Sequence, residues 1–220
     1  MGIFLEIAAD RPRGLNWTVV NMLDRAGVDK LDLTNLPTPY FDEQFDGIYS
    51  EHFIEHIHKY QGINFFKEAH RILKTGGTIR TVWPPYEFVE KLVSDTELNE
   101  NEKKFVEHYY QVYVVKYNFA AARNGHRSKR EQCALGLLHQ QGEHLYIWSI
   151  SEMIDMLKDI GFSSVKTCEY QKSKVLEFKD IETQEMIREI NSAVIEAKKW
   201  ISLFATSLKS KSEKNMRDYI

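Results

Sequence analysis

Short apolar runs separated by polar loops dominate the first part of the chain. Their β-branched and apolar content predicts strands at residues 3–7, 18–22, 29–33 and 45–50. Residues 8–17 lie between the first two runs and contain Gly, Pro, Asn and Asp, which is typical of a loop. Two later runs, at residues 78–83 and 165–170, also predict strands, the first of them ended by Pro84-Pro85.

Apolar residues at helical spacing alternate with these strands. One such stretch predicts a helix that ends at Gly76-Gly77. Another predicts a helix that begins at Ser149 with a capping box completed by Glu152 and that ends at Gly161. Residues 192–197 fit either a final strand or part of a longer helix.

Strands that alternate with helices predict an α/β fold with a mostly parallel sheet covered on both faces. Such sheets bind ligands beyond the carboxyl ends of their strands, at the switch point of strand order. We expect one domain over residues 1–200, with a helical insertion or lid at about 86–146. A basic tail at residues 201–220 fits a solvated segment better than a binding surface.

Composition narrows the class of protein. A length of 220 residues suits one domain, and 43% hydrophobic with 28% charged residues is typical of a globular chain. The net charge of −3 gives no global attraction to nucleic acid. Cys133 and Cys168 are too few for a disulfide framework. No apolar run approaches the roughly 20 residues of a membrane span, so we expect a cytoplasmic protein.

Several short motifs follow one another in a fixed order between Asp32 and Pro84. They are Asp32-Leu33, Leu36-Pro37, Phe45-Asp46-Gly47-Ile48-Tyr49-Ser50, Glu55-His56-Ile57, Arg71-Ile72-Leu73-Lys74-Thr75-Gly76-Gly77 and Arg80-Thr81-Val82-Trp83-Pro84. This order resembles the core of the class I S-adenosylmethionine-dependent methyltransferases, most of all the small methyltransferase type 11-like proteins associated with surface-glycan pathways. Weaker similarity extends over about residues 3–198, with gaps in 86–140.

The resemblance implies a Rossmann-like, doubly wound sheet of seven mostly parallel strands, with the helical insertion after the fifth strand. It also implies S-adenosylmethionine as cofactor and methyl transfer to a small-molecule or glycan-linked acceptor oxygen or nitrogen. No nucleic-acid partner and no membrane span are expected. The cofactor-binding positions that it assigns are Glu6, Ala8, Ala9, Asn21, Asp32, Leu33 and Ser50.

Alanines occupy the first loop, where the family has glycines. Glycine lets the backbone turn tightly and approach the cofactor, whereas the Cβ of alanine penalises a positive φ at Ala8 or Ala9. The family helix after this loop also has no room here, because the second strand follows so soon. Either the loop binds the cofactor along a shifted path, or cofactor binding is weakened or lost.

Two further cofactor contacts are implied at strand ends. Asn21 stands where the family has an acidic residue that holds the ribose hydroxyls, and nearby Asp24 is the alternative. Asp32 matches the position that accepts from the adenine amine. The competing interpretation is a simple turn residue for Asn21 and Asp24, and a solvated aspartate at a strand end for Asp32.

The residues that we predict to act at the acceptor are His52, Glu55, His56 and His144. A histidine with a near-neutral pKa suits proton removal. Methyl transfer depends chiefly on alignment, however, so a base is not essential, and a buried structural role for His56 fits equally well. Because the sequence fixes no third chelating ligand beside His52, Glu55, His56 and His58, we predict no metal site.

An aromatic stripe follows the fifth strand. It consists of Phe105, Tyr109, Tyr110, Tyr113, Tyr117 and Phe119. Core packing or the face of a homodimer is the usual meaning of such spacing, and a lid over the acceptor is the alternative. Pro84 and Tyr86, at the end of the fifth strand, are expected on the acceptor side.

Three functions compete on these residues. Methyl transfer is the leading one. A catalytically degenerate methyltransferase fold that serves as a binding or assembly module is favoured by Ala8, Ala9 and Asn21. A dehydrogenase is disfavoured because no Gly-x-Gly-x-x-Gly follows the first strand.

Overall fold

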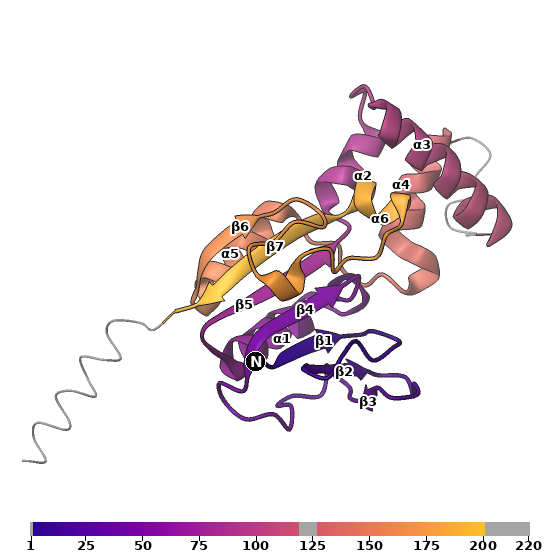
Figure 1. Ribbon diagram of the computed structural model, residues 1–220. Helices are drawn as coiled ribbons and strands as arrows, with labels where there is room; N and C mark the ends of the chain where they lie inside the picture. The colour runs from indigo at the N-terminus through magenta and orange to yellow at the C-terminus, as the bar shows by residue number, and fades with distance from the viewer. Residues whose placement is uncertain (1, 119–126, 201–220) are drawn as a thin grey trace, which may run out of the picture.

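A computed structural model describes residues 2–118 and 127–200 of the chain. Its centre is a seven-stranded sheet with the strand order β3-β2-β1-β4-β5-β7-β6. Every neighbouring pair is parallel except those of β7, which runs antiparallel to β5 and β6. The switch point of strand order lies between β1 and β4, at the middle of the sheet (Figure 1).

The strands are β1 (Phe4–Ile7), β2 (Trp17–Asn21), β3 (Asp29–Lys30), β4 (Phe45–Glu51), β5 (Leu73–Trp83), β6 (Phe162–Thr167) and β7 (Ala193–Lys199). The predicted number, order and mainly parallel direction of the strands are therefore confirmed. β3 is shorter than predicted, and β6 begins and ends three residues earlier. The open alternative at residues 192–197 resolves as a strand, while the predicted basic tail lies outside the described residues.

The helix between β4 and β5 ends earlier than the sequence predicts. This helix, α1 (Lys59–Ile72), gives way to β5 at Leu73, so the prediction that Gly76-Gly77 stops it is wrong. The glycines instead lie inside the long strand. A Cβ at Gly77 would come within 2.8 Å of the carbonyl oxygen of Lys74, and Gly76 has a φ of +83°. They serve a local bend of the strand.

The helix before β6 is capped as predicted. In α5 (Ile150–Ile160) the Ser149 hydroxyl accepts from the backbone N–H of Glu152, and Gly161 ends the helix with a φ of +112°. The carboxylate of Glu152 does not complete the predicted box. It accepts from the Tyr146 hydroxyl at 2.7 Å and pairs with Lys59 of α1, which fastens the two helices to each other.

Both helices pack on the same face of the sheet. Alternate strand residues such as Leu5, Ile7, Ile48 and Ile79 point to this side and join one large apolar cluster with α1 and α5. The burial of so many aliphatic and aromatic side chains is the main stabilising term of the domain.

The opposite face of the sheet has a different cover. No helix occurs in the connections 8–16 and 22–28, and the long segment between β6 and β7 lies over this face instead. Within it, the short 3-10 helix η4 (Leu176–Phe178) places Phe178 against Phe4 and Tyr49. A Cβ at Gly47 of β4 would come within 2.8 Å of the Phe178 ring, so the glycine permits this contact.

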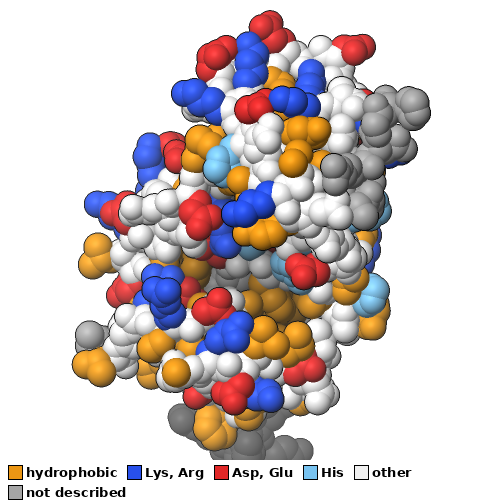
Figure 2. All heavy atoms as spheres, turned by 90° about the vertical axis from the view of Figure 1, so that its right-hand side faces the viewer, with side chains coloured by type: hydrophobic (Ala, Val, Ile, Leu, Met, Phe, Trp, Pro, Cys, Tyr) orange, Lys and Arg blue, Asp and Glu red, His pale blue; other side chains and the backbone are white. Residues whose placement is uncertain are grey.

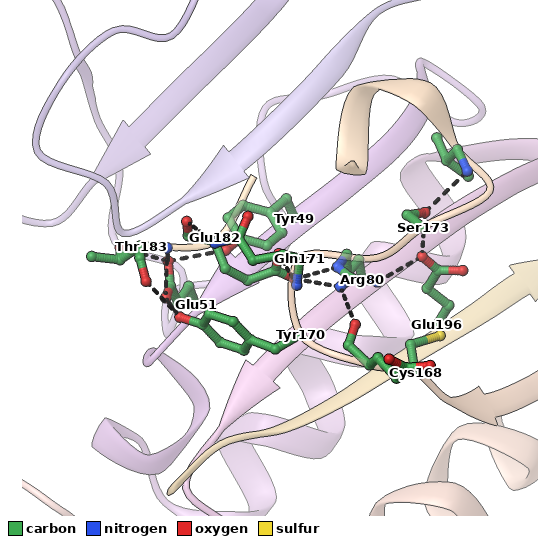
Figure 3. A network of polar contacts seen from close by, with 12 residues as sticks. Tyr49, Glu51, Arg80, Cys168, Tyr170, Gln171, Ser173, Glu182, Thr183 and Glu196 are labelled. Carbon is green, nitrogen blue, oxygen red and sulfur yellow. Dashed lines mark hydrogen bonds and ion pairs between the residues drawn. The ribbon is translucent and has the colours of Figure 1, made fainter. Parts of the chain in front are cut away.

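A buried ion-pair network holds that segment in place. The guanidinium of Arg80, in β5, is fully buried between the carboxylates of Glu182 and Glu196 (Figure 3). A buried guanidinium needs such partners, because an unpaired buried charge costs several kcal/mol, roughly 3–5 when a partner is removed. Removal of either carboxylate would therefore loosen the segment that covers this face.

A separate group of helices lies beyond the carboxyl ends of the central strands (Figure 1). It contains α2 (Tyr86–Val93), α3 (Glu100–Tyr109), a π-helix (Tyr110–Lys116), α4 (Lys129–His139) and α6 (Met186–Asn191). These helices share their own apolar core, to which Phe88, Phe105 and Leu137 belong. No helix in the described ranges is long and apolar enough to cross a membrane.

Candidate functional site

A large cavity lies at the carboxyl ends of β1 and β4. Its volume is about 790 Å³. The walls come from the loop after β1, from the end of β4 and from the β6–β7 segment; the lining residues are Glu6, Ile7, Ala8, Ala9, Asp10, Arg11, Pro12, Arg13, Glu51, His52, Thr183, Glu185 and Arg188. The cavity therefore stands at the switch point, where open α/β sheets bind ligands.

The first loop keeps the backbone form of a glycine loop although it holds alanines. Ala8 has a φ of +59°, a left-handed conformation that glycine adopts freely. The same conformation costs an L-residue with a Cβ about 1–2 kcal/mol. Ala8 and Ala9 both line the cavity, as predicted. The loop thus has the backbone conformation predicted for a cofactor-binding turn, and this conformation is strained at Ala8.

Glu6 also lines the cavity, but its carboxylate is already paired. Arg13 reaches back across the loop and donates from Nε and Nη2 to the two oxygens of Glu6, each at 2.5 Å. The guanidinium carbon also lies 5.6 Å from the ring centre of Trp17 and 5.9 Å from that of Tyr49. Arg13 occupies the side of the loop where the helix after β1 is missing.

The far wall of the cavity is fixed by Glu51, the last residue of β4. Its carboxylate accepts from the Tyr49 and Tyr170 hydroxyls, each at 3.0 Å, and from the Thr183 hydroxyl at 2.9 Å. Figure 3 shows Glu51, Tyr170 and Thr183 pointing toward one another. Arg188 of α6 lies 3.5 Å from the same carboxylate, so Glu51 joins the sheet to the helical group.

The structure does not bring Asn21 to the wall of this cavity. Its amide nitrogen donates to the Ala9 carbonyl at 3.1 Å and to Asp10 at 3.2 Å, while its amide oxygen accepts from the Leu23 N–H at 2.9 Å. Asn21 therefore shapes the loop after β1 from behind. Both residues that it touches in this loop, Ala9 and Asp10, line the cavity, and the Asp10 carboxylate also pairs with Arg25 at 2.7 Å.

Three other predicted cofactor residues also lie off the cavity wall. Asp32 is exposed and accepts from the Thr34 N–H and hydroxyl, which hold the pKa of its carboxyl below the ordinary value. Leu33 is buried in the main apolar cluster. The Ser50 hydroxyl donates to Thr81 at 2.9 Å between two buried strands. Asp32 thus stabilises a turn, Leu33 belongs to the core, and Ser50 links two neighbouring strands.

A second, smaller cavity of about 200 Å³ adjoins the first and shares His52, Glu185 and Arg188 with it. It is closed by Pro84 at the end of β5, by residues of the helical group and by two further histidines; these other lining residues are His56, Tyr109, Tyr113, Leu137, Gln140, His144, Ile187 and Asn191. Histidine side chains are visible on the recessed face between the sheet and the helical group (Figure 2).

His52 stands between the two cavities. It follows β4 directly, and its backbone has a φ of +50°. Its Nδ1 lies 3.0 Å from Oε1 of Glu55, and its Nε2 lies 3.0 Å from the Ser192 hydroxyl. A carboxylate behind one ring nitrogen fixes the orientation of the imidazole and favours a proton on that nitrogen.

The 3-10 helix η1 (Ile54–His56) contains Glu55 and His56, the other two residues of this segment that the sequence predicts at the acceptor. Both lie next to the second cavity. Glu55 is fully buried behind the cavity wall. His56 lines the wall, and its ring centre lies 4.9 Å from that of His144 in an edge-to-face arrangement. The structure thus gathers the four predicted residues His52, Glu55, His56 and His144.

Burial and mutual charge set the protonation of this cluster. Burial alone would raise the pKa of Glu55, but the three surrounding imidazoles hold it below its ordinary value. Burial is the main reason that the pKa of His144 falls below its ordinary value. At neutral pH the cluster therefore contains a carboxylate beside a neutral His144 ring.

Part of the aromatic stripe packs in the core of the helical group, as the first of the sequence interpretations predicts, and part of it lines the second cavity. Tyr109 stacks on Phe105 and Tyr113, with ring centres 5.3 and 4.6 Å apart, and is buried in the helical core. Tyr109 and Tyr113 also line the second cavity. Tyr117 is exposed, and Phe119 lies outside the described residues.

Sequence reasoning missed several residues of the first cavity. They are Asp10, Arg11, Arg13, Glu51, Thr183, Glu185 and Arg188. The position of Glu51, at the end of a predicted strand, was the one usable signal among them. The last three come from a segment without periodic pattern, and only the folded chain brings them to the sheet.

A model of the methyltransferase domain family matches residues 18–81 of the chain. No curated protein matches the sequence. The matched range covers β2 to β5 and includes His52, Glu55 and His56, and it ends before the helical group.

Two solved structures of methyltransferases align with this chain, and the first of them supports the same fold. A SAM-dependent methyltransferase from Archaeoglobus fulgidus aligns with a TM-score of 0.53 at 16% identity, over 90% of this chain and 86% of that one. The 1,6-didemethyltoxoflavin-N1-methyltransferase of Burkholderia thailandensis aligns with a TM-score of 0.48 at 14% identity, over 91% of this chain and 72% of the other. At such identities the likeness speaks for the fold alone.

Proposed function

We propose that the chain is a class I S-adenosylmethionine-dependent methyltransferase that transfers the methyl group to a small acceptor bound in the second cavity. Its fold and the family match over residues 18–81 support this proposal. The observation that carries the proposal is the pair of adjoining cavities. The larger lies at the switch point, and the smaller opens beside it at the shared residues His52, Glu185 and Arg188.

The larger cavity suits a zwitterionic nucleoside ligand. Glu185 can face the cationic amine of the cofactor, and Arg188 can face its carboxylate. Glu51 adds negative charge to the same wall while its carboxylate is held by Tyr170 and Thr183. The Asp10 carboxylate takes the place proposed for Asn21 as acceptor from the ribose hydroxyls, since Asn21 is occupied within the loop. The backbone turn at Ala8 and Ala9 lines the same cavity and would hold the methionine end of the cofactor.

The smaller cavity suits an acceptor of the size of one ring. Tyr109, Tyr113 and Pro84 offer apolar contact, while three imidazoles surround the reacting end. A nucleophilic oxygen or nitrogen attacks the methyl carbon as the carbon–sulfur bond breaks, and the bonding pair stays on sulfur. His52 Nε2 receives the proton of the nucleophile, and Glu55 behind Nδ1 stabilises the resulting imidazolium. A sugar hydroxyl and a ring nitrogen both meet these requirements.

The other candidate is the degenerate module, which Ala8 and the Arg13–Glu6 pair favour. A strained loop and a neutralised carboxylate would both weaken cofactor binding. This module would keep the fold and bind neither S-adenosylmethionine nor S-adenosylhomocysteine. The two candidates therefore differ in one equilibrium constant.

Titration calorimetry separates them. The wild type should bind S-adenosylhomocysteine with a Kd below about 100 μM, or roughly −5.5 kcal/mol. Ala9→Phe should abolish binding by filling the cavity, whereas Leu15→Phe, in the same loop but fully exposed, should leave it unchanged. Absence of binding to the wild type supports the module. Radiolabelled S-adenosylmethionine with a panel of hydroxyl and amine acceptors then tests turnover, which His52→Gln should reduce about 100-fold or more.

We further propose that the protein works in the cytoplasm and does not bind nucleic acid. Both cysteines are free thiols, Cys133 buried and Cys168 half-buried, which fits the reducing cytoplasm. We assign no nucleic-acid partner. The exposed side chain of Tyr117, together with the neighbouring exposed Val115, offers a contact surface for a homodimer, which sedimentation of the full chain would detect.

A further inference from the structure

We propose that Glu55, His56 and His144 form a binding site for a divalent transition-metal ion, with Zn²⁺ as the best-suited ion, at the wall of the second cavity. The inference builds on the proposed function, because it assigns a ligand for the acceptor in that cavity. The ligand atoms of the three residues lie within 4.8 Å of one another. Two of them come from η1 and the third from the chain after α4, so only the fold brings them together.

The two imidazoles are already oriented as metal ligands are. His56 Nδ1 lies 3.1 Å from the Glu143 carbonyl oxygen, and His144 Nδ1 is hydrogen-bonded to the Leu137 carbonyl oxygen. A carbonyl accepts only, so each Nδ1 carries the proton and each Nε2 keeps its lone pair. Metal-bound histidines usually have such a partner on the second ring nitrogen.

Glu55 carries a buried negative charge that has few compensating partners in the part of the chain that the structure describes. Its side chain is fully buried, and Oε1 lies 3.0 Å from His52 Nδ1. Beyond this ion-pair contact, neither oxygen of the carboxylate accepts a hydrogen bond of good geometry within residues 2–118 and 127–200. A buried carboxylate costs several kcal/mol unless a partner compensates it. A divalent cation held by Oε2 and the two Nε2 atoms would be such a partner.

The donor set indicates which ion fits. Two imidazoles with one carboxylate suit Zn²⁺ and the neighbouring first-row ions, whereas Mg²⁺ prefers oxygen ligands throughout. Three protein ligands leave one position of a tetrahedral ion open, as in catalytic zinc sites. Since His56 and His144 line the second cavity, the open position faces the acceptor.

This arrangement narrows the acceptor to a hydroxyl compound. A hydroxyl oxygen bound to the ion has a lowered pKa and loses its proton more readily. His52 lies beside the same carboxylate and lines both cavities, so it can receive that proton. We therefore expect an alcohol or a sugar hydroxyl to be methylated, in preference to an amine.

Metal binding by the full-length protein tests the site without any cofactor. After removal of metal with a chelator, titration with Co²⁺ should give a visible absorption band of a low-coordinate site with nitrogen ligands. Calorimetry with Zn²⁺ should give one site per chain with a Kd below about 1 μM, or roughly −8.2 kcal/mol. Glu55→Gln and His144→Asn should each weaken Zn²⁺ binding by about 100-fold or more. His139→Asn, an exposed histidine at the end of α4, is the matched control and should bind Zn²⁺ as the wild type does.

A wild type that binds no Zn²⁺ or Co²⁺, or a Glu55→Gln variant that binds Zn²⁺ normally, would overturn the proposal. If a variant does not fold, X-ray absorption of the Zn²⁺-loaded wild type decides, because the site requires two imidazole ligands and one carboxylate oxygen. S-adenosylhomocysteine binding is measured separately on the metal-free protein. A wild type that binds Zn²⁺ but not S-adenosylhomocysteine would count against the proposed function. A wild type that binds S-adenosylhomocysteine but not Zn²⁺ would count against the metal site.

Discussion

Arg13 donates from two nitrogen atoms to the two carboxylate oxygens of Glu6, each at 2.5 Å, at the mouth of the cavity where β1 ends. The pair removes the negative charge that Glu6 would otherwise present to a ligand. Because the cofactor carries a sulfonium that its product lacks, this neutralisation should weaken S-adenosylmethionine binding more than S-adenosylhomocysteine binding.

Arg13→Gln should therefore raise the affinity for S-adenosylmethionine relative to S-adenosylhomocysteine. The expected change in the ratio is about threefold to tenfold, since a partly screened charge pair is worth about 1 kcal/mol. Calorimetric Kd values for both ligands measure it. Arg11→Gln removes an equal charge from the same cavity wall without freeing Glu6, so it should leave the ratio closer to that of the wild type.

Ala8→Gly should stabilise the protein, because Ala8 has a φ of +59°. Relief of the left-handed conformation outweighs the greater chain entropy of glycine, for a net gain of about 0.5–1 kcal/mol in the free energy of unfolding. Urea unfolding measures the change. Ala9→Gly, at the next position, should be neutral or destabilising, and equal effects of the two substitutions would show that the loop is not strained at Ala8.

Gly47→Ala should destabilise the sheet face that the β6–β7 segment covers. A Cβ there would come within 2.7 Å of the Phe4 ring and within 2.8 Å of the Phe178 ring. Overpacking of this kind costs about 1–3 kcal/mol. Gly14→Ala, whose nearest neighbour atoms would be 3.9 Å away, should change the free energy of unfolding much less. If Phe178→Leu costs as much stability in the Gly47→Ala background as in the wild type, the contact with Phe178 is not part of the cause.

Acid should weaken the attachment of the 31–44 loop to α1. Burial alone would raise the pKa of Glu68, but Arg71 and Thr38, which donate to its carboxylate, hold that pKa below the ordinary value. A carboxyl with a lowered folded pKa stabilises the protein above its unfolded pKa of about 4.3, and this contribution disappears as the pH falls through the folded value.

Denaturant unfolding from about pH 6 to pH 3 checks this prediction. The wild type should lose stability on acidification more steeply than Glu68→Gln, and the two should converge at low pH. Glu97→Gln, at an exposed position, removes one negative charge without touching this contact, so it should keep the steep wild-type slope. Parallel curves for wild type and Glu68→Gln would contradict the assignment.

The sheet could be predicted because its signals are local. Apolar runs such as 3–7 and 45–50 have the length and content of buried strands, and Ser149 and Gly161 mark the ends of a helix by their own chemistry. Gly76-Gly77 misled the prediction, since the same two glycines fit a helix end and a bend within a strand. Only the pairing of Leu73 with Phe45 of β4 distinguishes these two possibilities.

The candidate site could be predicted only in part. Glu6, Ala8, Ala9 and His52 follow directly from strand ends, so their places are set by topology. Asn21 and Ser50 also stand at strand ends. Their side chains, however, donate hydrogen bonds to Asp10 and Thr81 and do not line the cavity. Arg13 and Thr183 could not be found, because their positions depend on loops that pack on a face without helices. Arg188 could not be found either, because only the folded chain brings helix α6 to the end of β4.

A crystal structure of the protein grown with S-adenosylhomocysteine tests the central claim most directly. The account predicts the ligand at the carboxyl ends of β1 and β4, with its ribose beside Asp10 and its sulfur directed toward His52 and the second cavity. A ligand bound elsewhere on the protein, or a cavity without ligand at saturating concentration, would contradict it.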